Sequence, residues 1–282
     1  MPAESQHLAQ KLQNWFEPFP EVIVALSGGV DSAIVAQAAF IAKGLHAKAV
    51  TAVSPSLAAS EQSIAKQIAR QIGISHTLLS TDELSQEGYR ENSFNRCYFC
   101  KSTLYDTILK QDWQGRLIVN GANADDASDH RPGMKAAKEF NVRSPLLELG
   151  YNKQTVRQIA QFYELPIWNK PASPCLSSRI AYGVPVTAER LQQIEQAEAY
   201  LKHLTENSNL RVRLLAGNKA SLEFTSPWIA KLSEPATALQ IEHQLKAFGF
   251  AEVSIDPEGF RSGKLNQQIP ADQLVQIDGQ QP

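Results

Sequence analysis

A short segment with two adjacent glycines most constrains the fold of this 282-residue chain. The segment 27–32, with the sequence Ser-Gly-Gly-Val-Asp-Ser, follows the apolar run 22–26 and precedes a helical pattern over 33–43. This order predicts a strand, a tight turn and a helix, which direct several backbone N–H groups and the positive end of a helix to one point. Such a point binds anionic phosphate, since glycines let the backbone approach closely and the hydroxyls of Ser27 and Ser32 add donors.

The segment 27–32 differs from two common nucleotide-binding motifs. No lysine follows the glycines, so it is not G-x-x-x-x-G-K-[ST], and it is not the dinucleotide motif G-x-G-x-x-G. It resembles instead the PP-loop of ATP pyrophosphatases. That resemblance implies that the loop holds the β,γ-pyrophosphate of ATP with the help of Mg²⁺, while AMP is transferred to a substrate oxygen.

Composition excludes several classes of protein. The 27 basic and 29 acidic side chains give a net charge of −2, so no global field attracts nucleic acid. No apolar run is long enough for a transmembrane helix, and the N-terminus lacks the basic and apolar regions of a signal peptide. With three cysteines, at least one stays unpaired in any intramolecular scheme. We therefore expect a cytoplasmic protein without a membrane partner, carrying reactive or metal-binding thiols.

The first 170 residues alternate between apolar strand patterns and helical patterns, starting with a short helix over 5–16. After the glycine segment the pattern predicts strands at 47–53, 76–79 and 117–119, a strand or extended segment at 143–149, and helices at 60–72, 101–110, 135–140 and 153–163. This alternation predicts an α/β fold with a mostly parallel, doubly wound sheet of the PP-loop (adenine nucleotide alpha hydrolase-like) type. Ligands then bind at the C-terminal ends of the strands, where segment 27–32 and Gly121 fall.

Four prolines interrupt regular structure between residues 165 and 187. Thr187 is then the expected N-cap of a helix that reaches about residue 204, followed by strands at 210–215 and 220–224, a helix at 238–248 and a strand at 251–255. We therefore predict a PP-loop domain over 1–170, a Pro-rich cysteine-bearing linker over 171–186, a small C-terminal α+β domain over 187–270 and a loose tail over 271–282.

The cysteines allow several interpretations. Cys97 and Cys100 form a C-x-x-C, and Cys175 lies alone in the Pro-rich linker. A zinc site would need a fourth ligand. A redox dithiol would be expected to open a helix, which the pattern does not predict here. Three thiolates can hold three irons of a 4Fe–4S cluster and leave the fourth open, for example to sulfide. Three separate buried cysteines are the remaining alternative.

Several motifs together resemble the LarE family of ATP-dependent sulfur transferases, over about residues 20 to 265. They are segment 27–32, Gly-Ala-Asn-Ala-Asp-Asp at 121–126 with Arg-Pro-Gly at 131–133, Pro-Cys-Leu-Ser-Ser-Arg-Ile-Ala-Tyr-Gly at 174–183, Arg-Val-Arg at 211–213, and Gly-Phe-Arg-Ser-Gly at 259–263. The resemblance implies a step in the synthesis of the nickel-pincer nucleotide. ATP adenylylates a carboxylate of pyridinium-3,5-biscarboxylic acid mononucleotide, and a sulfur nucleophile displaces AMP.

The resemblance also implies roles for particular residues. Those that bind ATP are Ser27, Gly28, Gly29, Asp31, Ser32, Gly121 and Asp125, of which Asp31 and Asp125 lie near Mg²⁺. Those that bind the nucleotide substrate are Lys101, Arg179, Arg211 and Arg213. The two strand arginines alternate and so share one face, although a solvated strand face would show the same pattern.

Two sulfur sources remain open. In the well-known form of the family, the cysteine at the position of Cys175 gives up its own sulfur. Cys97 and Cys100 resemble instead the members in which three catalytic cysteines hold a 4Fe–4S cluster, with sulfide or another sulfur donor as a partner. A homo-oligomer is expected from the family.

Three other functions compete with this interpretation. A tRNA thiolase would normally show a basic face or an added RNA-binding module. An amide-forming ligase of the NAD-synthetase or GMP-synthetase type would not need three cysteines. An ATP-binding regulatory module would not need acidic, basic and thiol groups in its signature loops.

Overall fold

The computed structural model describes residues 2–113, 115–128, 132–207 and 209–261. They form two compact units. The first consists of Met1–Glu83 and Cys97–Ser173, and the second of Leu84–Arg96 and Pro174–Pro282. The segment Leu84–Arg96, placed by the sequence pattern in the first domain, thus packs with the second unit. The predicted tail 271–282 lies outside the described residues, as do Arg131 and Gly263 of the family motifs.

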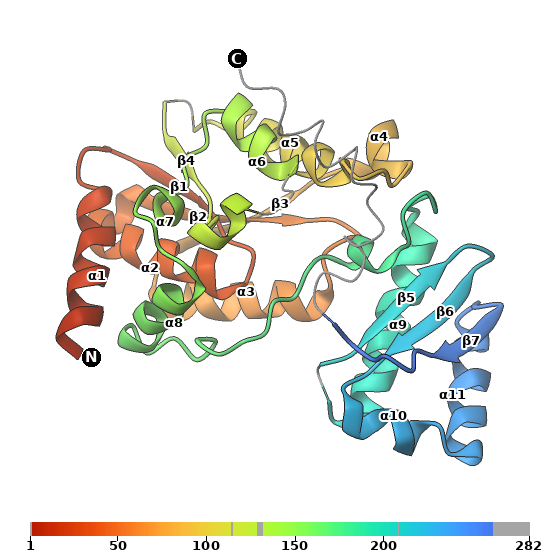
Figure 1. Ribbon diagram of the computed structural model, residues 1–282. Helices are drawn as coiled ribbons and strands as arrows, with labels where there is room; N and C mark the ends of the chain where they lie inside the picture. The colour runs from red at the N-terminus through yellow and green to blue at the C-terminus, as the bar shows by residue number, and fades with distance from the viewer. Residues whose placement is uncertain (1, 114, 129–131, 208, 262–282) are drawn as a thin grey trace. The chain divides into compact units, whose positions relative to one another are not determined.

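The first unit is built on a four-stranded parallel sheet with the order β3-β2-β1-β4 (Figure 1). The strands are β1 (Val22–Ala25), β2 (Ala47–Val53), β3 (Ser75–Ser80) and β4 (Leu117–Val119). This arrangement confirms the predicted α/β fold with a parallel sheet. Because β1 has β2 on one side and β4 on the other, the chain order reverses beside β1. The C-terminal ends of β1 and β4 therefore flank the position where open α/β sheets bind ligands.

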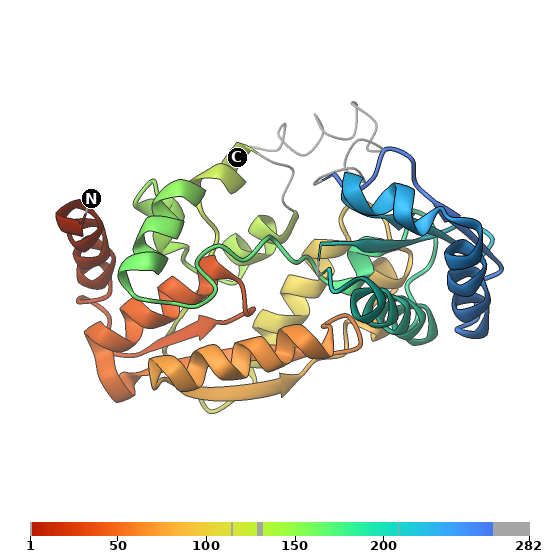
Figure 2. The ribbon, with the colours of Figure 1, turned by 90° about the horizontal axis from the view of Figure 1, so that it is seen from below.

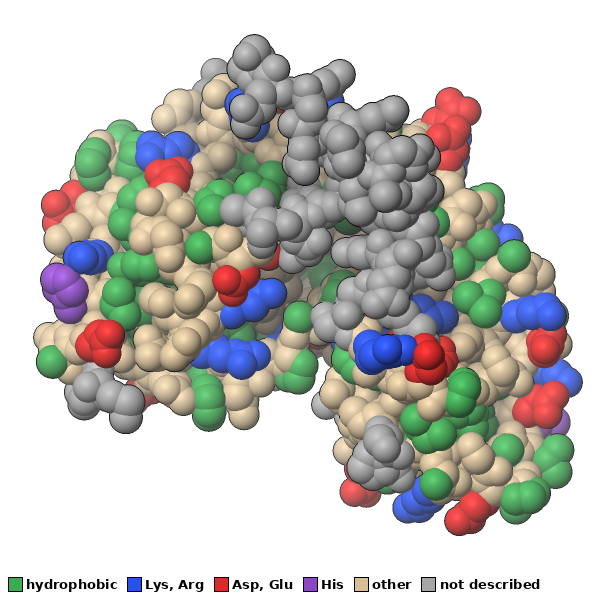
Figure 3. Space-filling view, in the orientation of Figure 1, with side chains coloured by type: hydrophobic (Ala, Val, Ile, Leu, Met, Phe, Trp, Pro, Cys, Tyr) green, Lys and Arg blue, Asp and Glu red, His purple; other side chains and the backbone are tan. Residues whose placement is uncertain are grey.

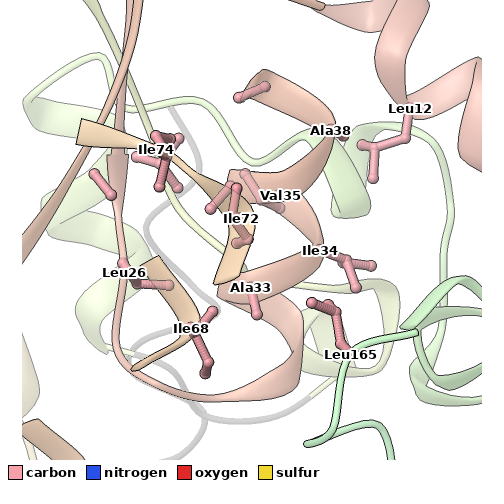
Figure 4. Close-up of a cluster of buried hydrophobic side chains, with 14 of the residues drawn as sticks. Leu12, Leu26, Ala33, Ile34, Val35, Ala38, Ile68, Ile72, Ile74 and Leu165 are labelled. Carbon is pink, nitrogen blue, oxygen red and sulfur yellow. The ribbon is translucent and has the colours of Figure 1, made fainter. Parts of the chain in front are cut away.

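Helices cover both faces of this sheet (Figures 1 and 2). One face packs against α1 (Pro2–Trp15), α2 (Val30–Lys43), α3 (Ala59–Ile72) and α8 (Lys153–Phe162), and the other against α5 (Arg96–Leu109) and α6 (Pro132–Glu139). Side chains of β1 point alternately to the two faces of the sheet, so each face has its own hydrophobic core. Val22 and Val24 are buried in the core on the first face, and Ile23 is buried in the core on the other. Figure 4 shows part of the first core, in which Ile34 of α2 and Ile68 of α3 are buried.

Two short segments of the first unit differ from the predictions. The strand or extended segment expected over 143–149 is wrong from Pro145 on, because Arg143 makes an isolated bridge to Val119 and the chain then turns into α7 (Pro145–Glu148). Pro145 has no N–H for a strand ladder and suits the first turn of a helix. The helix expected from residue 101 begins at Arg96. The remaining short elements are η1 (Gly44–His46), η2 (Glu83–Ser85) and η3 (Ala124–Ser128).

The second unit contains a three-stranded sheet with the order β5-β6-β7 (Figure 1). β5 (Arg211–Leu215) pairs antiparallel with β6 (Lys219–Glu223), which pairs parallel with β7 (Glu252–Ile255). Its helices are α4 (Glu87–Arg90), η4 (Leu176–Arg179), α9 (Ala188–Thr205), α10 (Ser226–Leu232) and α11 (Pro235–Ala247). Thr187 caps α9 as predicted, since its side chain accepts a hydrogen bond from the N–H of Arg190. Helix α10 was not predicted.

The described helices include none with the length and apolar composition needed to cross a bilayer.

Candidate functional site

The glycine loop 27–32 links the end of β1 to the start of α2, as the sequence predicts. Its two serines brace it. The hydroxyl of Ser32 accepts a hydrogen bond from the N–H of Ser27 at 3.1 Å, donates to the carbonyl of Gly29 at 3.1 Å and lies 3.0 Å from the hydroxyl of Ser27. Gly29 is the N-cap of α2 and has no side chain to cap the helix, while its own N–H donates to the hydroxyl of Ser27 at 3.3 Å. The first N–H groups of α2 are therefore available to an anion at this end of the helix.

Two glycines pack the loop against its neighbours. Gly28 has φ +80°, and a Cβ there would lie 3.0 Å from the carbonyl oxygen of Glu61 in α3. A Cβ on Gly121, which follows β4, would lie 2.6 Å from the backbone nitrogen of Ser32. Real Cβ atoms essentially never approach another atom to 2.6 Å, and a distance of 3.0 Å is tighter than nine in ten of their contacts. The structure thus brings Gly121 directly against the loop, although 89 residues separate Gly121 from Ser32 along the chain.

Asp31 is the acidic group of the loop, and Asn123 orients it. The amide of Asn123 donates to a carboxylate oxygen of Asp31 at 2.6 Å. Burial raises the pKa of Asp31, the hydrogen bond from Asn123 opposes this, and the negative charge of Asp126 adds to the rise. A divalent cation beside this carboxylate would favour its ionised form, and carboxylate oxygens suit Mg²⁺.

Asp125 has a different environment from Asp31. Its carboxylate accepts a hydrogen bond at 2.9 Å from the N–H of Lys153 at the start of α8, and its own N–H donates to the side chain of Asn123. Asp126 instead contributes to the electrostatics of Asp31. Sequence reasoning missed Asn123, although it lies inside the motif 121–126.

The C-x-x-C lies in the first turn of α5, which corrects the expectation that it does not open a helix. Cys97 is exposed and Cys100 half-buried, and neither forms a disulfide. Residues three apart on a helix are neighbours on one side, so the two thiols can act together. The interpretation of Cys97 and Cys100 as a redox dithiol, which requires the start of a helix, therefore stays open. Lys101 follows in the same helix, and its side chain lies beside Gly133 at the start of α6.

Cys175 is half-buried and precedes the turn η4. Its carbonyl oxygen accepts hydrogen bonds from the guanidinium of Arg179 at 3.0 Å and from the hydroxyl of Ser178 at 2.7 Å. The chain around the thiol is therefore fixed by the residues that follow it. Within residues 2–113, 115–128, 132–207 and 209–261, no three His, Cys, Asp or Glu side chains are grouped so that they could hold a metal ion.

A buried ion-pair network holds Arg179. Its guanidinium donates to both carboxylate oxygens of Glu198 in α9, at 2.9 and 3.3 Å, and the two side chains are only 3% and 4% exposed. Glu198 also accepts from Lys202 and from the N–H of Val212 in β5. Burial alone would raise the pKa of Glu198, but the charge and hydrogen bonds of Arg179, with Lys202 and Arg211, hold it below its usual value.

Arg211 and Arg213 lie in β5 beside this network. Arg213 pairs with the buried Glu223 at 3.1 Å and donates to the carbonyl of Ser178 at 2.6 Å. Arg211 lies over the ring of Phe260, and its pKa is lowered first by burial and then by the positive charge of Arg179. Three guanidiniums thus gather around the turn that follows Cys175. This part of β5 is therefore not a solvated strand face, and Glu198 and Glu223 offset part of its positive charge.

A second network, which sequence reasoning missed, joins the segment before Cys97 to the segment after Cys175. The buried Arg96 donates to the side chain of Asn92 and, at 2.8 Å, to the carbonyl of Ser177. Asn92 is fully buried with φ +56° and donates to the carbonyls of Ile180, Ala181 and Val184. These bonds lie within the second unit. The signal in the sequence was weak, since Arg96 and Asn92 belong to no motif.

Charged side chains are mixed on the face drawn in Figure 3, where Lys and Arg alternate with Asp and Glu. This distribution does not form the basic stripe by which proteins neutralise a nucleic acid backbone.

Comparison with known proteins places the chain in a family. A model of the asparagine synthase family matches residues 8–90. Pyridinium-3,5-bisthiocarboxylic acid mononucleotide synthase of Lactiplantibacillus plantarum is 31% identical over 265 residues, which cover 90% of this chain and 92% of that protein. The chain belongs to the LarE family. It is a PP-loop enzyme and an ATP-dependent sulfur transferase.

Two further proteins match over nearly their whole length. The uncharacterized protein slr1717 of Synechocystis sp. is 44% identical over 92% of this chain and 96% of that protein. The uncharacterized protein MJ0830 of Methanocaldococcus jannaschii is 27% identical over 91% of this chain and 95% of that protein. The asparagine synthase match covers less than a third of the chain, including the loop 27–32. It therefore supports the shared ATP-binding fold and not the amide-forming reaction.

Proposed function

We propose that this protein adenylylates a carboxylate of pyridinium-3,5-biscarboxylic acid mononucleotide and replaces one of its oxygens by sulfur, in the synthesis of the nickel-pincer nucleotide. The observation that carries the proposal is the grouping of Arg179, Arg211 and Arg213 around the turn that follows Cys175. A substrate with one phosphate and two carboxylates carries the charge that three guanidiniums suit. The printed name of the Lactiplantibacillus relative, a bisthiocarboxylic acid synthase, supports the same reaction.

The first half-reaction takes place at the glycine loop. A carboxylate oxygen of the substrate attacks the α-phosphorus of ATP, the bond from that phosphorus to the bridging oxygen breaks, and pyrophosphate leaves. Ser27, Gly28, Gly29 and Ser32 bind the pyrophosphate through backbone and hydroxyl donors. Asp31 and Asp125 are the proposed Mg²⁺ ligands, with Gly121 fixing the loop. Mg²⁺, when bound, neutralises phosphate charge.

The second half-reaction needs a sulfur nucleophile. It attacks the carbonyl carbon of the acyl-adenylate, the bond to AMP breaks, and a thiocarboxylate forms. Lys101 and the three arginines bind the substrate's anionic groups. The protein acts in the cytoplasm as a homo-oligomer.

The thiols are the proposed ligands of a 4Fe–4S cluster. Cys97 and Cys100 fit such a group, because they are thiols outside any disulfide and lie on one side of a helix. Cys175 would be the third ligand. When bound, the cluster supplies an iron that can carry sulfide. Donation of the sulfur of Cys175 itself is the alternative.

Replacement of Cys175 by serine tests the division into two half-reactions. We expect Cys175→Ser to release pyrophosphate from ATP and the dicarboxylate nucleotide at a rate within about threefold of the original, because the loop is unchanged. The same variant should form no thiocarboxylate, since a hydroxyl does not replace a thiolate here. Pyrophosphate release and mass spectrometry of the product measure the two steps. Thiocarboxylate formed at the original rate by serine variants of all three cysteines would exclude the proposal.

Iron and acid-labile sulfide analysis under argon tests the sulfur source. The cluster proposal expects about four irons and four sulfides per chain, lost in each of the three Cys→Ser variants. It also expects an unchanged intact mass of the polypeptide after turnover. Absence of iron, together with loss of one sulfur atom from the polypeptide, would establish that Cys175 is consumed.

A further inference from the structure

Lys170 contacts the glycine loop from outside every motif. Its ammonium donates to the carbonyl of Gly28 at 3.0 Å and to the carboxylate of Glu61 at 2.5 Å. The side chains of Lys170 and Glu61 are only 16% and 15% exposed. A lysine loses considerable side-chain entropy when it is held in one place, so a buried lysine bound to a loop carbonyl indicates a specific role.

The bond to Gly28 determines which way the next peptide faces. In a planar trans peptide, the carbonyl of Gly28 and the N–H of Gly29 point in opposite directions. Because the ammonium holds that carbonyl on one side, the N–H of Gly29 is directed to the other. Gly29 is the N-cap of α2, and its N–H donates at 3.3 Å to the hydroxyl of Ser27, so it faces the side of the loop on which the serine hydroxyls lie. If this peptide flipped, a carbonyl oxygen would face the anion and repel it.

Glu61 anchors Lys170 to α3. Its carboxylate lies in the first turn of that helix, and its backbone carbonyl is the atom that a Cβ on Gly28 would meet. Lys170 thus connects the loop to α3 at the point where the two already touch. The carboxylate neutralises part of the lysine's charge, which leaves orientation of the peptide as the main effect.

We infer that Lys170 is a positioning residue for ATP. It fixes the peptide between Gly28 and Gly29 so that the N–H faces the hydroxyl of Ser27 and, through this side of the loop, the pyrophosphate of the nucleotide. The inference rests on the proposed function, in which this loop holds that pyrophosphate.

Four variants test the inference. Lys170→Met removes the donor, Lys170→Gln keeps an N–H donor without the charge, and Lys170→Arg keeps both. The matched control is Lys43→Met, because Lys43 also donates to a backbone carbonyl, that of Glu17 at 2.8 Å, but at the far end of α2. Binding of a non-hydrolysable ATP analogue with Mg²⁺ and of inorganic pyrophosphate is measured by calorimetry. Thermal unfolding establishes that each variant is folded.

We expect Lys170→Met to weaken binding of both probes by about 10- to 100-fold, as for loss of a charged hydrogen bond. Lys170→Arg should restore binding to within about threefold, with Lys170→Gln between the two. In steady state, the KM for ATP should rise more than kcat falls. Lys43→Met should bind both probes like the original protein.

Glu61→Gln separates positioning from a merely structural ion pair. The amide removes the ion pair but leaves Lys170 able to hold the carbonyl of Gly28. The loss of ATP affinity in Glu61→Gln should therefore be smaller than the loss in Lys170→Met by a factor of at least about three. Equal losses in the two variants would overturn the inference, as would a folded Lys170→Met with undiminished binding. Failure of the original protein to bind either probe would instead contradict the proposed function.

Discussion

Replacement of Glu198 by alanine is expected to lower the free energy of unfolding of the second unit by roughly 3–5 kcal/mol. Glu198 is buried, and its two carboxylate oxygens each accept a hydrogen bond from Arg179, which is buried as well. Removing the carboxylate leaves a guanidinium without its counter-charge in the interior, which costs far more than loss of a surface ion pair. The network also fixes the carbonyl of Cys175 through Arg179, so sulfur transfer should be lost with the fold.

Hydrogen exchange of peptides from α9 and β5, combined with urea unfolding, measures this effect. The matched control is Glu242→Ala in α11, because Glu242 forms an exposed i,i+4 ion pair with Lys246. For this control we expect the free energy of unfolding to change by less than about 0.5 kcal/mol. A Glu198→Ala protein within about 1 kcal/mol of the original would show that the network does not stabilise the unit.

The pH dependence of stability follows from the same carboxylate. Because the folded protein holds the pKa of Glu198 below its usual value, the group stabilises the fold fully above the unfolded pKa of about 4.3. This contribution is lost as the pH falls from there through the folded pKa. In Glu198→Gln, which cannot titrate, the loss of stability between about pH 5 and pH 3 should be smaller than in the original protein. An unchanged acid dependence would exclude Glu198 as its source.

Local patterns in the sequence predicted the strands and helices around the loop. The apolar run before Gly28 and the helical spacing after it depend on neighbours in the chain, so β1 and α2 formed where expected. The strand or extended segment predicted over 143–149 was wrong from Pro145 on, because a single bridge at Arg143 is all the pairing that remains before α7. An apolar segment of that length does not distinguish a strand from a helical turn.

The buried polar networks could not be read from the sequence, since their partners lie far apart along the chain. Lys170 and Gly28 are 142 residues apart, and Arg96 and Ser177 are 81 apart. A lysine or an asparagine outside a motif looks like a surface residue until the fold shows it to be buried. The arginines of the motifs were found by resemblance, whereas Glu198 and Glu223, which hold them in place, were not.

Replacement of Gly121 by alanine is expected to abolish most ATP-dependent activity while the protein stays folded. The new methyl group would lie 2.6 Å from the backbone nitrogen of Ser32, so the start of α2 or the end of β4 must move by about an ångström. Misplacement of a binding group by that distance can cost on the order of 100-fold in rate. Pyrophosphate release and binding of the ATP analogue should fall together, because the same backbone donors serve both.

Gly150→Ala provides the matched control for this steric effect. Gly150 has φ +70° and no atom within 4 Å of the position that a Cβ would take, so alanine there strains the backbone without pushing on the loop. It should cost about 1 kcal/mol of stability and leave ATP binding unchanged. If Gly121→Ala bound ATP as tightly as Gly150→Ala, contact between the β4 turn and the loop would not govern nucleotide binding. The contrast therefore tests whether it is the close packing of two segments, and not glycine flexibility, that shapes the anion site.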